Sequence, residues 1–328
     1  MQASSDIRPP DGASDAVSLS VLMVNWNTKA MTLEALRTLY SNTHETNFET
    51  ILVDNGSHDG SAQAIARQYP QVRLIAEDSN LGFAKANNLA ADAAKGEYLL
   101  LLNSDTEVRD GAIDKLIAFS RLHPDARIWG GRTIFANGSL NIGSAWGKLT
   151  VWSAFCFATG LSHLFSRSNL FDPEALRGWD RSSERQVDIV SGCFFLIERK
   201  FWQELGGFDL DFFMYGEEAE LCLRARELGA KPRVTPKATI VHHGGASATT
   251  RFQSRMSVCA AKVALARKHM NPIAAAMVRQ FYISGVGLRR AIYAIGGLFS
   301  SKANQQARIW EEVWIRRNAW SRGVIPAE

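Results

Sequence analysis

The sequence predicts an α/β protein with a mostly parallel central sheet flanked by helices, followed by a C-terminal helical extension. Apolar runs of strand length alternate with helical patterns as far as residue 102. This alternation is typical of βαβ units, whose strands lie parallel and are covered on both faces. From about Ser257 the apolar spacing becomes helical.

The expected elements follow one another from residue 19. A strand is expected at 19–24, and a helix at 31–40, because its leucines recur at helical spacing. Further strands are expected at 51–53, 72–76 and 98–102, with helices near 61–68 and 84–94 between them. Two short strands are expected within 187–197, joined around Ser191-Gly192-Cys193.

The composition is that of a globular protein of enzyme size. With 328 residues, 46% hydrophobic and 21% charged, the chain is neither disordered, collagen-like nor a disulfide-stapled miniprotein. Residues 1–17 lack an apolar stretch and indicate a flexible leader, not a signal peptide. Four scattered cysteines without CxxC spacing favour reduced thiols and a cytoplasmic location over a zinc site.

The modest net charge of +4 conceals a strong asymmetry along the chain. Residues 251–328 hold 13 Lys and Arg against three acids, a net charge of +10. The remainder holds 24 basic and 30 acidic residues, a net charge of −6. A basic tail on a mildly acidic body indicates an anionic partner, either a membrane or a nucleic acid.

A polar cluster follows each of the first four expected strands. The clusters are Asn25-Trp26-Asn27, Asp54-Asn55-Gly56-Ser57, Asn80-Leu81-Gly82-Phe83 and Asn103-Ser104-Asp105. Each alone fits a turn or a helix cap, but the carboxyl ends of parallel strands meet at one edge, where ligands bind. A shared ligand explains all four better. The chain has neither GxGxxG after the first strand nor GxxxxGK[ST], which excludes the usual dinucleotide and P-loop sites.

These motifs resemble family 2 glycosyltransferases of the GT-A fold, and most closely the rhamnosyltransferase-like branch of bacterial cell-surface polysaccharide and O-antigen assembly. The second half of the chain agrees, and the resemblance covers about residues 18–250. Its motifs there are Gly206-Gly207-Phe208-Asp209, Phe213-Met214-Tyr215-Gly216-Glu217-Glu218 and His242-His243-Gly244-Gly245-Ala246-Ser247. It implies a catalytic domain at 18–250, with a nucleotide-sugar half at 18–134, an acceptor half at 135–250, and a basic amphipathic helical extension at 251–328.

The resemblance also implies which residues hold the donor. Asp105 and His242 would bind a divalent metal, Mg²⁺ or Mn²⁺. Asn103 stands where the family has the first aspartate of its DxD motif, so the metal is expected to bind mainly with the nucleotide present. The nucleotide would be bound by Asn25, Trp26, Asn27, Asp54, Asn55, Ser57, Asn80, Gly82, Phe83, Asn103 and Ser104.

The pair Glu217-Glu218 matches the family's Glu-Asp motif, whose second member acts as the base. Glu218 is therefore the expected catalytic base, with Glu217 beside it, although acids in a first helical turn also interact favourably with the helix dipole. Asp188, Gly192 and Glu220 are expected at the acceptor, while Glu220 fits equally well a pair with Arg224 one turn later.

The expected reaction is an inverting, metal-dependent transfer of a sugar from a nucleotide diphosphate. The resemblance favours dTDP-L-rhamnose as donor, with a UDP-sugar as the other choice, and a saccharide or polyprenyl-linked glycan as acceptor. Two alternatives stay open at this point: a nucleotidyltransferase that makes nucleotide sugars, and a non-catalytic binder of nucleotide sugars or nucleic acid.

Two further segments stand apart from these motifs. Residues 151–157 are unusually aromatic and fit a sugar- or lipid-contacting loop, or else a core helix or lid packed on the sheet. Residues 281–299 approach transmembrane length, but Arg289 and Arg290 at their centre make a spanning helix too costly.

The basic tail predicts peripheral attachment to the inner face of the cytoplasmic membrane. Apolar residues of 281–328 share one helical face, and Trp310, Trp314 and Trp320 lie among arginines, as at an anionic lipid interface. The alternative is packing on the body or on a second subunit, so oligomerisation stays open. No recognised nucleic-acid motif accompanies the charge, and no nucleic acid is expected.

Overall fold

The computed structural model describes residues 17–244 and 251–323. The expected leader at 1–17, Gly245-Ala246-Ser247 and the last five residues therefore fall wholly or almost wholly outside the described residues. Within the described chain, ten strands form one mixed sheet. In sheet order its path is β3 (Arg73–Glu77), β2 (Phe48–Asn55), β1 (Leu19–Asn25), β4 (Tyr98–Leu102), β11 (Phe194–Glu198), β6 (Ile128–Ile134), β12 (Arg233–His242) and β5 (Thr106–Val108).

Most of these strands run in one direction, as the sequence predicts. Strands β3, β2, β1 and β4 pair in parallel, and β12 pairs in parallel with β6. Strand β11 lies antiparallel between β4 and β6, so it joins two sets of strands that share one direction. Short strands complete the edges: β7 (Leu140–Asn141), β9 (Arg185–Gln186), and the separate pair β8 (Ala145–Trp146) and β10 (Ile189–Val190).

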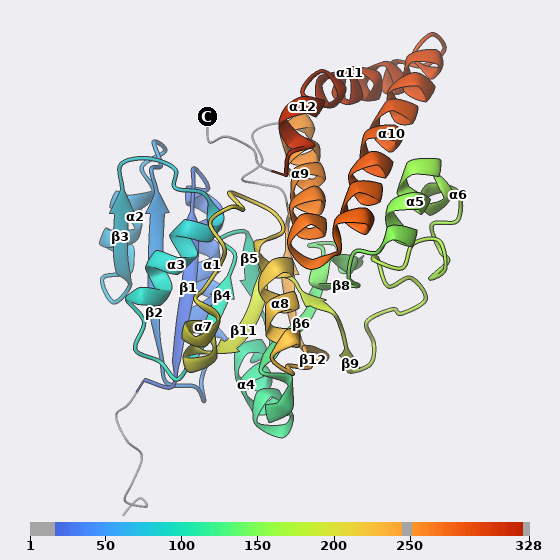
Figure 1. The fold of residues 1–328 in the computed structure, drawn as a ribbon. Helices are drawn as coiled ribbons and strands as arrows, with labels where there is room; N and C mark the ends of the chain where they lie inside the picture. Colours follow the sequence, from blue (N-terminus) through green and yellow to red (C-terminus); the bar gives the residue numbers. More distant parts are fainter. Residues whose placement is uncertain (1–16, 245–250, 324–328) are drawn as a thin grey trace, which may run out of the picture.

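Helices cover both faces of the sheet (Figure 1). Successive side chains of a strand point to opposite faces, and β1 shows this: Leu22 belongs to one core, while Val21 and Met23 belong to the other. The first core includes helices α3 (Phe83–Asp92), α7 (Arg199–Leu205) and α8 (Glu217–Glu227), and the second includes α1 (Lys29–Ser41), α2 (Ser61–Gln68) and α4 (Ala112–Leu122).

The C-terminal helices form a bundle beside the sheet. They are α9 (Arg251–His269), α10 (Pro272–Gly296), α11 (Ser301–Ile315) and α12 (Arg317–Trp320). Asn271 caps α10 by accepting a hydrogen bond from the Ala274 N–H at 2.9 Å, and Pro272 follows it in the first turn, where its missing N–H costs nothing. In Figure 1, α10 and α11 extend well beyond the edge at which β1 and β2 end.

The aromatic segment at 151–157 is a helix, α5 (Val151–Thr159), followed by the short α6 (Leu161–Leu164). Of the two expectations, the packed helix is the one that the structure has, but α5 packs on α10 and not on the sheet. The rings of Phe157 and Tyr282 stack with centroids 4.6 Å apart, and Arg289 donates a hydrogen bond to the Phe157 carbonyl at 2.8 Å.

The tryptophans of the tail do not form the lipid-facing surface that the sequence suggested. Trp310 and Trp320 are buried within the bundle, and the indole N–H of Trp320 donates to the Val313 carbonyl at 2.8 Å. The expectation was wrong for these two residues because a helical face that packs on protein has the same apolar spacing as one that meets lipid.

Candidate active site

A cavity of about 520 Å³ opens at the edge where β1, β2 and β4 end. Its volume is within the range of small-molecule and cofactor sites. Three segments that are far apart in the sequence meet there: the ends of the first parallel strands, the loop before α8, and the end of β12. Of the expected site residues, the lining contains Trp26, Asn55, Asn80, Phe83, Asn103, Ser104, Asp105, Gly192, Glu217, Glu218 and His242.

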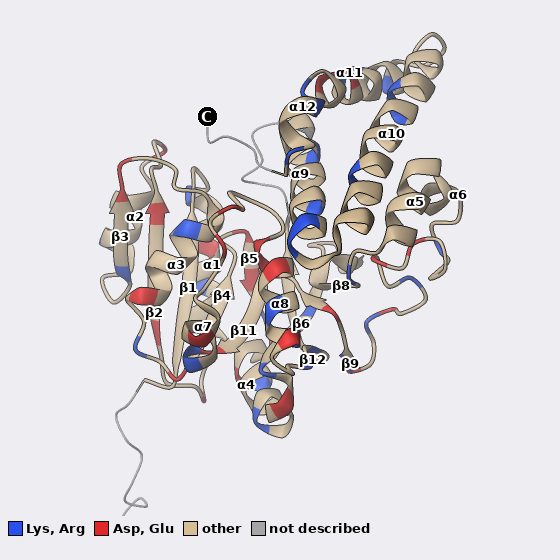
Figure 2. Ribbon diagram, viewed as in Figure 1, with Lys and Arg blue, Asp and Glu red and all other residues tan. Residues whose placement is uncertain are grey.

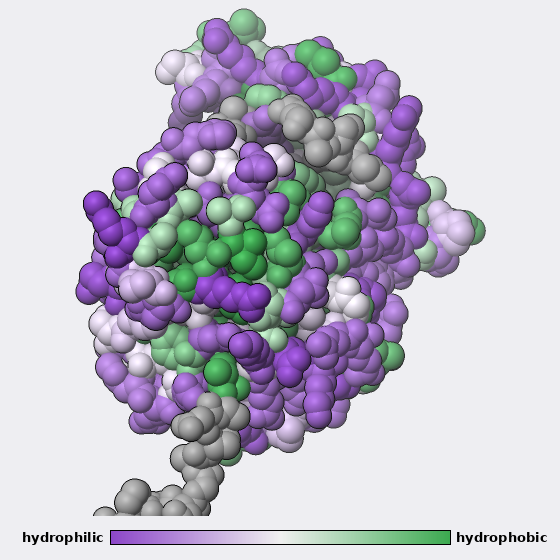
Figure 3. Space-filling model, turned by 90° about the vertical axis from the view of Figure 1, so that its left-hand side faces the viewer, coloured by the Kyte–Doolittle hydropathy of each residue, from purple (hydrophilic) through white to green (hydrophobic). Residues whose placement is uncertain are grey.

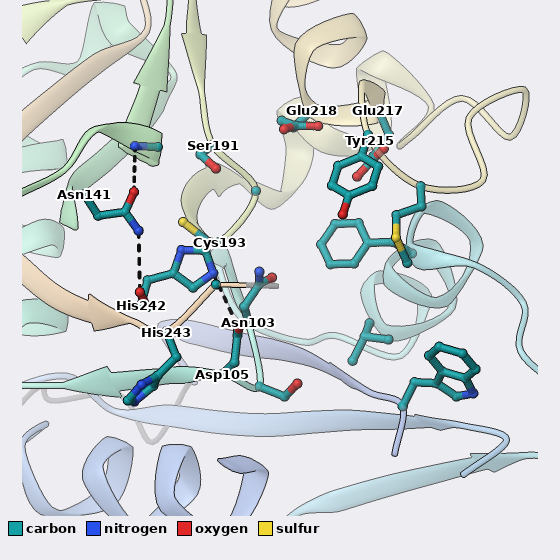
Figure 4. Close-up of a pocket in the computed structure, with 18 of the residues that line it drawn as sticks. Asn103, Asp105, Asn141, Ser191, Cys193, Tyr215, Glu217, Glu218, His242 and His243 are labelled. Carbon is teal, nitrogen blue, oxygen red and sulfur yellow. Dashed lines mark hydrogen bonds and ion pairs between the residues drawn. The ribbon is translucent and has the colours of Figure 1, made fainter. Parts of the chain in front are cut away.

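Asp105 and His242 form an ion pair on one side of the cavity. The Asp105 Oδ1 and His242 Nε2 atoms are 3.3 Å apart, and both side chains are largely buried (Figure 4). Burial alone would raise the pKa of Asp105, but the hydrogen bond and the charge of His242 hold it below its ordinary value. Burial opposes the charged form of His242, yet Cys193 and Asp105 beside the ring raise the pKa of His242 to about 10.

This pair can hold a divalent metal only with help from other donors. A carboxylate oxygen and an imidazole nitrogen suit Mn²⁺, and the Nδ1 atom of His242 is buried without a partner. In the described part of the chain, no set of three His, Cys, Asp or Glu side chains lies close enough together to hold a metal. The residues therefore fit a metal whose remaining ligands come from a bound diphosphate or from water.

The next residue, His243, is engaged elsewhere. Its Nε2 atom lies 2.8 Å from Glu107 Oε1, and its backbone N–H donates to the Asp105 carbonyl at 3.0 Å. The end of β12 is fixed from the other side by Asn141, whose amide donates to the His242 carbonyl at 3.4 Å (Figure 4). These contacts hold His242 toward Asp105.

Glu217 and Glu218 approach the cavity from the first turn of α8, on the side away from Asp105 (Figure 4). The Oε2 atom of each is buried without a hydrogen-bond partner. Burial, and then the charge of Glu218, raise the pKa of Glu217 well above its ordinary value. Burial also raises the pKa of Glu218. The pair thus holds a proton more readily than ordinary glutamates do.

The turn before α8 aims these two glutamates. Tyr215 and Gly216 have φ angles of 70° and 93°, in the left-handed region that favours glycine. Tyr215 accepts this conformation at a cost, and its ring lies beside Glu217 in the cavity (Figure 4).

Several expected donor-binding residues lie behind the cavity lining. Asn25 donates to Asp54 Oδ2 at 2.6 Å and to Ser57 Oγ at 3.0 Å, and its own oxygen accepts from Thr28 and Thr32. The Asn27 side chain accepts from the backbone of the next loop. Asn25, Asn27, Asp54, Ser57 and Gly82 are not in the lining, so in this structure they fix the loops that carry Trp26 and Asn55.

Asp188 and Glu220, expected at the acceptor, also lie outside the lining and are engaged in ion pairs. Asp188 pairs with Arg226 at 2.6 Å and accepts from the Lys148 backbone. Glu220 pairs with Arg224 at 2.6 Å, the partner one turn later, and with His269 of α9 at 3.5 Å. Contact of Asp188 and Glu220 with an acceptor stays a prediction, and it is not favoured, because both carboxylates are already paired with basic side chains.

Other lining residues were not singled out from the sequence. Tyr215 and Met214 lay inside a quoted motif, but no role was assigned to them. The lining residues without a sequence-based role are Val24, Phe135, Asn141, Gly143, Trp146, Ser191, Cys193, Met214, Tyr215, His243 and Gly244.

Comparison with known proteins agrees with this geometry. The family model described as glycosyl transferase family 2 matches residues 20–205, more than half of the chain. An N-acetylglucosaminyl-diphospho-decaprenol L-rhamnosyltransferase of Mycobacterium tuberculosis is 29% identical over 204 residues, covering 59% of this chain and 66% of that protein. An O-antigen biosynthesis protein RfbC of Myxococcus xanthus is 28% identical over 212 residues, covering 64% and 16%. The match thus spans less than two thirds of either relative.

Solved structures share the fold at low sequence identity. A mannosyltransferase from Pyrobaculum calidifontis, in complex with GDP-Man and Mn²⁺, matches 96% of this chain and 91% of its own with a TM-score of 0.57 and 16% identity. The GalNAc-T7 structure with UDP, GalNAc and Mn²⁺ matches 77% and 48% with a TM-score of 0.56 and 18% identity. These likenesses confirm the GT-A fold that the sequence predicts.

Proposed function

The chain belongs to glycosyl transferase family 2, and from this premise we propose that it is an inverting glycosyltransferase that uses a nucleotide-diphosphate sugar. One observation carries the proposal: a single cavity holds a carboxylate–imidazole pair on one side and two buried glutamates on another. Group transfer from a diphosphate needs both, because one site must bind the leaving group while another removes the acceptor's proton.

Asp105 and His242 would hold the metal, with Asn103 beside them. When bound, a divalent cation neutralises charge that develops on the departing diphosphate. Mn²⁺ suits this donor set better than Mg²⁺ because one ligand is an imidazole. Since the protein supplies few ligands, the cation and the nucleotide are expected to bind together. Trp26, Asn55 and Asn80 line the nucleotide side of the cavity.

Glu218 would act as the base. The acceptor hydroxyl attacks the anomeric carbon from the face opposite the diphosphate and gives its proton to the Glu218 carboxylate as the new bond forms. A raised pKa makes this carboxylate a stronger base, provided that it is ionised. Two adjacent buried carboxylates disfavour double ionisation, and we assign the ionised form to Glu218, the member that the family motif makes the base. One displacement at the anomeric carbon inverts its configuration.

The donor we favour is dTDP-L-rhamnose, and the acceptor a saccharide on a lipid carrier. The support is the resemblance to the rhamnosyltransferase-like branch, together with the L-rhamnosyltransferase activity named for the mycobacterial relative. A UDP-sugar is the second choice.

A donor panel tests this proposal. The full chain is screened against dTDP- and UDP-sugars with Mn²⁺ for thermal stabilisation and for slow hydrolysis of the sugar nucleotide. Glu218→Gln should lower turnover by about 10²- to 10⁴-fold while donor binding persists. The exposed Glu97→Gln serves as the matched control and should turn over normally. Asp105→Asn should abolish the Mn²⁺-dependent part of donor affinity in calorimetry.

The result can contradict the proposal in two ways. Wild-type turnover by the Glu218→Gln variant would remove Glu218 as the base. Formation of a nucleotide sugar from a nucleoside triphosphate and a sugar phosphate, without transfer to an acceptor, would indicate a nucleotidyltransferase instead.

A further inference from the structure

The last turns of α10 and the loop that joins it to α11 carry a group of exposed apolar side chains, which we call the tip (residues 292–299). Ile292, Ile295, Leu298 and Phe299 are 56%, 64%, 79% and 86% exposed. Large apolar side chains at such exposure and in one group mark an interaction surface. In Figure 3 the uppermost atoms of the molecule belong to this end, and hydrophobic atoms lie there next to hydrophilic ones.

The rest of α10 does not continue this apolar surface without a break. Further from the tip, the same exposed side of the helix carries Gln280 and Ser284, which lie within hydrogen-bond distance of each other at 3.4 Å. On the other sides, Gly285 and Arg289 pack on α5 and are covered. Ile273, Met277 and Leu288 also leave apolar surface uncovered on α10, at 75%, 43% and 39% exposed, but Leu298 and Phe299 are the most exposed and follow directly after Ile292 and Ile295.

The chain on both sides of the tip is mainly basic. Residues 251–310 contain ten Lys and Arg and no Asp or Glu. Many of these cations already have a protein partner: Lys262 pairs with Glu174, Lys268 with Asp209, and Arg290 with Glu311. Lys302 in the first turn of α11 and Arg308 in its middle are both exposed. Figure 2 shows basic segments, coloured blue, on α10 and α11.

We propose that the tip inserts into the interface of an anionic lipid bilayer, with Lys302 and Arg308 at the level of the headgroups. Apolar side chains next to basic ones fit the boundary between acyl chains and anionic headgroups. This proposal rests on the proposed function only in that a lipid-linked acceptor would be found there. No helix in the described residues is both long and apolar enough to cross a membrane, so the contact is a surface insertion.

A second copy of the chain fits this surface less well. At roughly 200 Å² per large side chain, the four apolar residues offer roughly 600 Å² at most. A stable interface needs about 800 Å² from each partner. A convex tip of this size is suited to a soft, deformable surface.

The direction of the tip agrees with this partner. The α10–α11 hairpin extends beyond the edge of the sheet at which β1 and β2 end, and the cavity lies at the same edge (Figure 1). A bilayer that received the tip would therefore lie on the cavity's side of the molecule.

Point variants test the tip better than a truncation would. Removing residues 281–328 would uncover Phe157 and the buried face of α9, so the remaining chain would not represent the native protein. The double variant Leu298→Asp/Phe299→Asp changes only exposed side chains. Its matched control, Leu122→Asp/Leu228→Asp, places the same charges on leucines that are 73% and 53% exposed at the ends of α4 and α8.

The experiment is co-sedimentation of the full chain with vesicles of phosphatidylcholine, with and without phosphatidylglycerol. We expect the wild type and the control to bind the anionic vesicles and the tip variant to bind at least tenfold more weakly. Lys302→Gln/Arg308→Gln should weaken binding about fivefold per cation removed. Equal binding by the tip variant, or no binding by the wild type, would overturn the proposal.

A fluorescent label distinguishes insertion from a helix that lies flat. The four native cysteines are at most 3% exposed, so Phe299→Cys can be labelled selectively with an environment-sensitive dye, with Ser284→Cys as its control. When anionic vesicles are added, the fluorescence of the dye should rise severalfold on the Phe299→Cys variant and stay unchanged on the Ser284→Cys variant. An equal rise at both positions would contradict insertion of the tip. So would light scattering that shows a dimer for the wild type and a monomer for the tip variant.

Sugar-nucleotide hydrolysis without vesicles keeps the two proposals separate. The tip variant should hydrolyse the donor at the wild-type rate. If the wild type binds vesicles but hydrolyses no sugar nucleotide, the proposed function fails while the tip proposal survives.

Discussion

Glu217 and Glu218 are neighbours in the sequence, and the fold buries both of them beside the cavity. Each carboxylate has an oxygen without a hydrogen-bond partner, and burial raises the pKa of both. Two adjacent buried carboxylates disfavour double ionisation, so the pair retains a proton that two ordinary glutamates would release. The motif in the sequence identifies the pair, whereas its burial is apparent only in the fold.

The first prediction concerns the pH dependence of turnover. Because Glu218 must be ionised to accept a proton and its pKa is raised, activity should increase as pH rises through a value above that of an ordinary glutamate, near 4.5. Below that pH, turnover should fall about tenfold per pH unit. A pH–rate profile with saturating donor measures this limb. An apparent pKa at or below the ordinary glutamate value on the acid side of the profile would contradict Glu218 as the base. The control variant Glu97→Gln should have the same pH–rate profile as the wild type.

At the residue scale, the sequence predicts which residues meet at the cavity better than it predicts their hydrogen-bond and ion-pair partners. Asp105 and His242, 137 positions apart, were expected to lie together and do so. The pairing of Glu220 with Arg224 could be foreseen from its spacing, whereas that with His269 could not, because it depends on where α9 docks. Tyr215 was missed because a positive φ at a non-glycine residue leaves no mark in the sequence.

At the scale of elements, α8 shows how backbone geometry places a catalytic turn. Gly216 begins the helix with φ at 93°, and Gly229 follows its end with φ at 89°. A Cβ on Gly216 would lie 2.8 Å from the Cβ of Ala261 in α9, whereas one on Gly229 would meet nothing within 4 Å. The start of α8 is thus pressed against the C-terminal bundle.

This difference gives the second prediction. Gly229→Ala should lower the free energy of unfolding by about 1 kcal/mol, the cost of a side chain at positive φ. Gly216→Ala should lower it by about 2 to 4 kcal/mol, because the new methyl group also crowds Ala261. Urea denaturation of both variants measures the effect. Equal losses would show that the contact between α8 and α9 is looser than the structure indicates.

The elements themselves follow the sequence closely where turn residues bound them. The expected strand at 98–102 and the expected helix at 61–68 coincide with β4 and α2. The direction of β11 could not be foreseen, because a buried apolar run has the same composition in parallel and antiparallel pairing. The docking of α5 on α10 was likewise outside what periodicity reveals, since periodicity identifies an apolar face but not its partner.

At the scale of the whole molecule, the basic C-terminal helices act on the cavity from behind its lining, which contains no described residue after Gly244. Lys262 of α9 pairs with Glu174, and its positive charge also lowers the pKa of Glu218. Two turns further along the same helix, Lys268 pairs with Asp209 and Asp211. Part of the positive charge of the C-terminal helices is therefore neutralised by acidic residues of the body of the same molecule.

The third prediction is that Lys262 and Lys268 differ in their effect on the pH dependence of turnover. Removing a nearby cation raises the pKa of a carboxylate, so Lys262→Met should move the acid limb of turnover to higher pH. Lys268→Met removes the same charge from the same helix but should leave the limb in place. Both variants should lower the Tm, because both break ion pairs that join α9 to the body. Identical pH profiles for the wild type and Lys262→Met would contradict the coupling between α9 and Glu218.

The tail shows the limit of prediction from sequence alone. Its charge, its helical spacing and the barrier to membrane crossing were apparent, but Trp310 and Trp320 proved to be internal. Ile292, Ile295 and Phe299, which belong to the apolar face expected within 281–328, stay exposed near the α10–α11 loop, as do Ile273 and Ile315 elsewhere in the tail. A helical face that packs on protein and one that meets lipid share the same periodicity, so only the fold distinguishes them.

If the tip inserts as we propose, the packing of α10 would bear on the size of acceptor that can reach the cavity. A helix of 25 residues is about 37 Å long, and contacts with α5 and α9 fix it to the body that holds the cavity. With its tip in a bilayer, α10 would fix the distance between the cavity and the lipid surface. Carriers bearing too few sugars would not reach the catalytic glutamates, so acceptor length would be selected by geometry before any sugar is recognised.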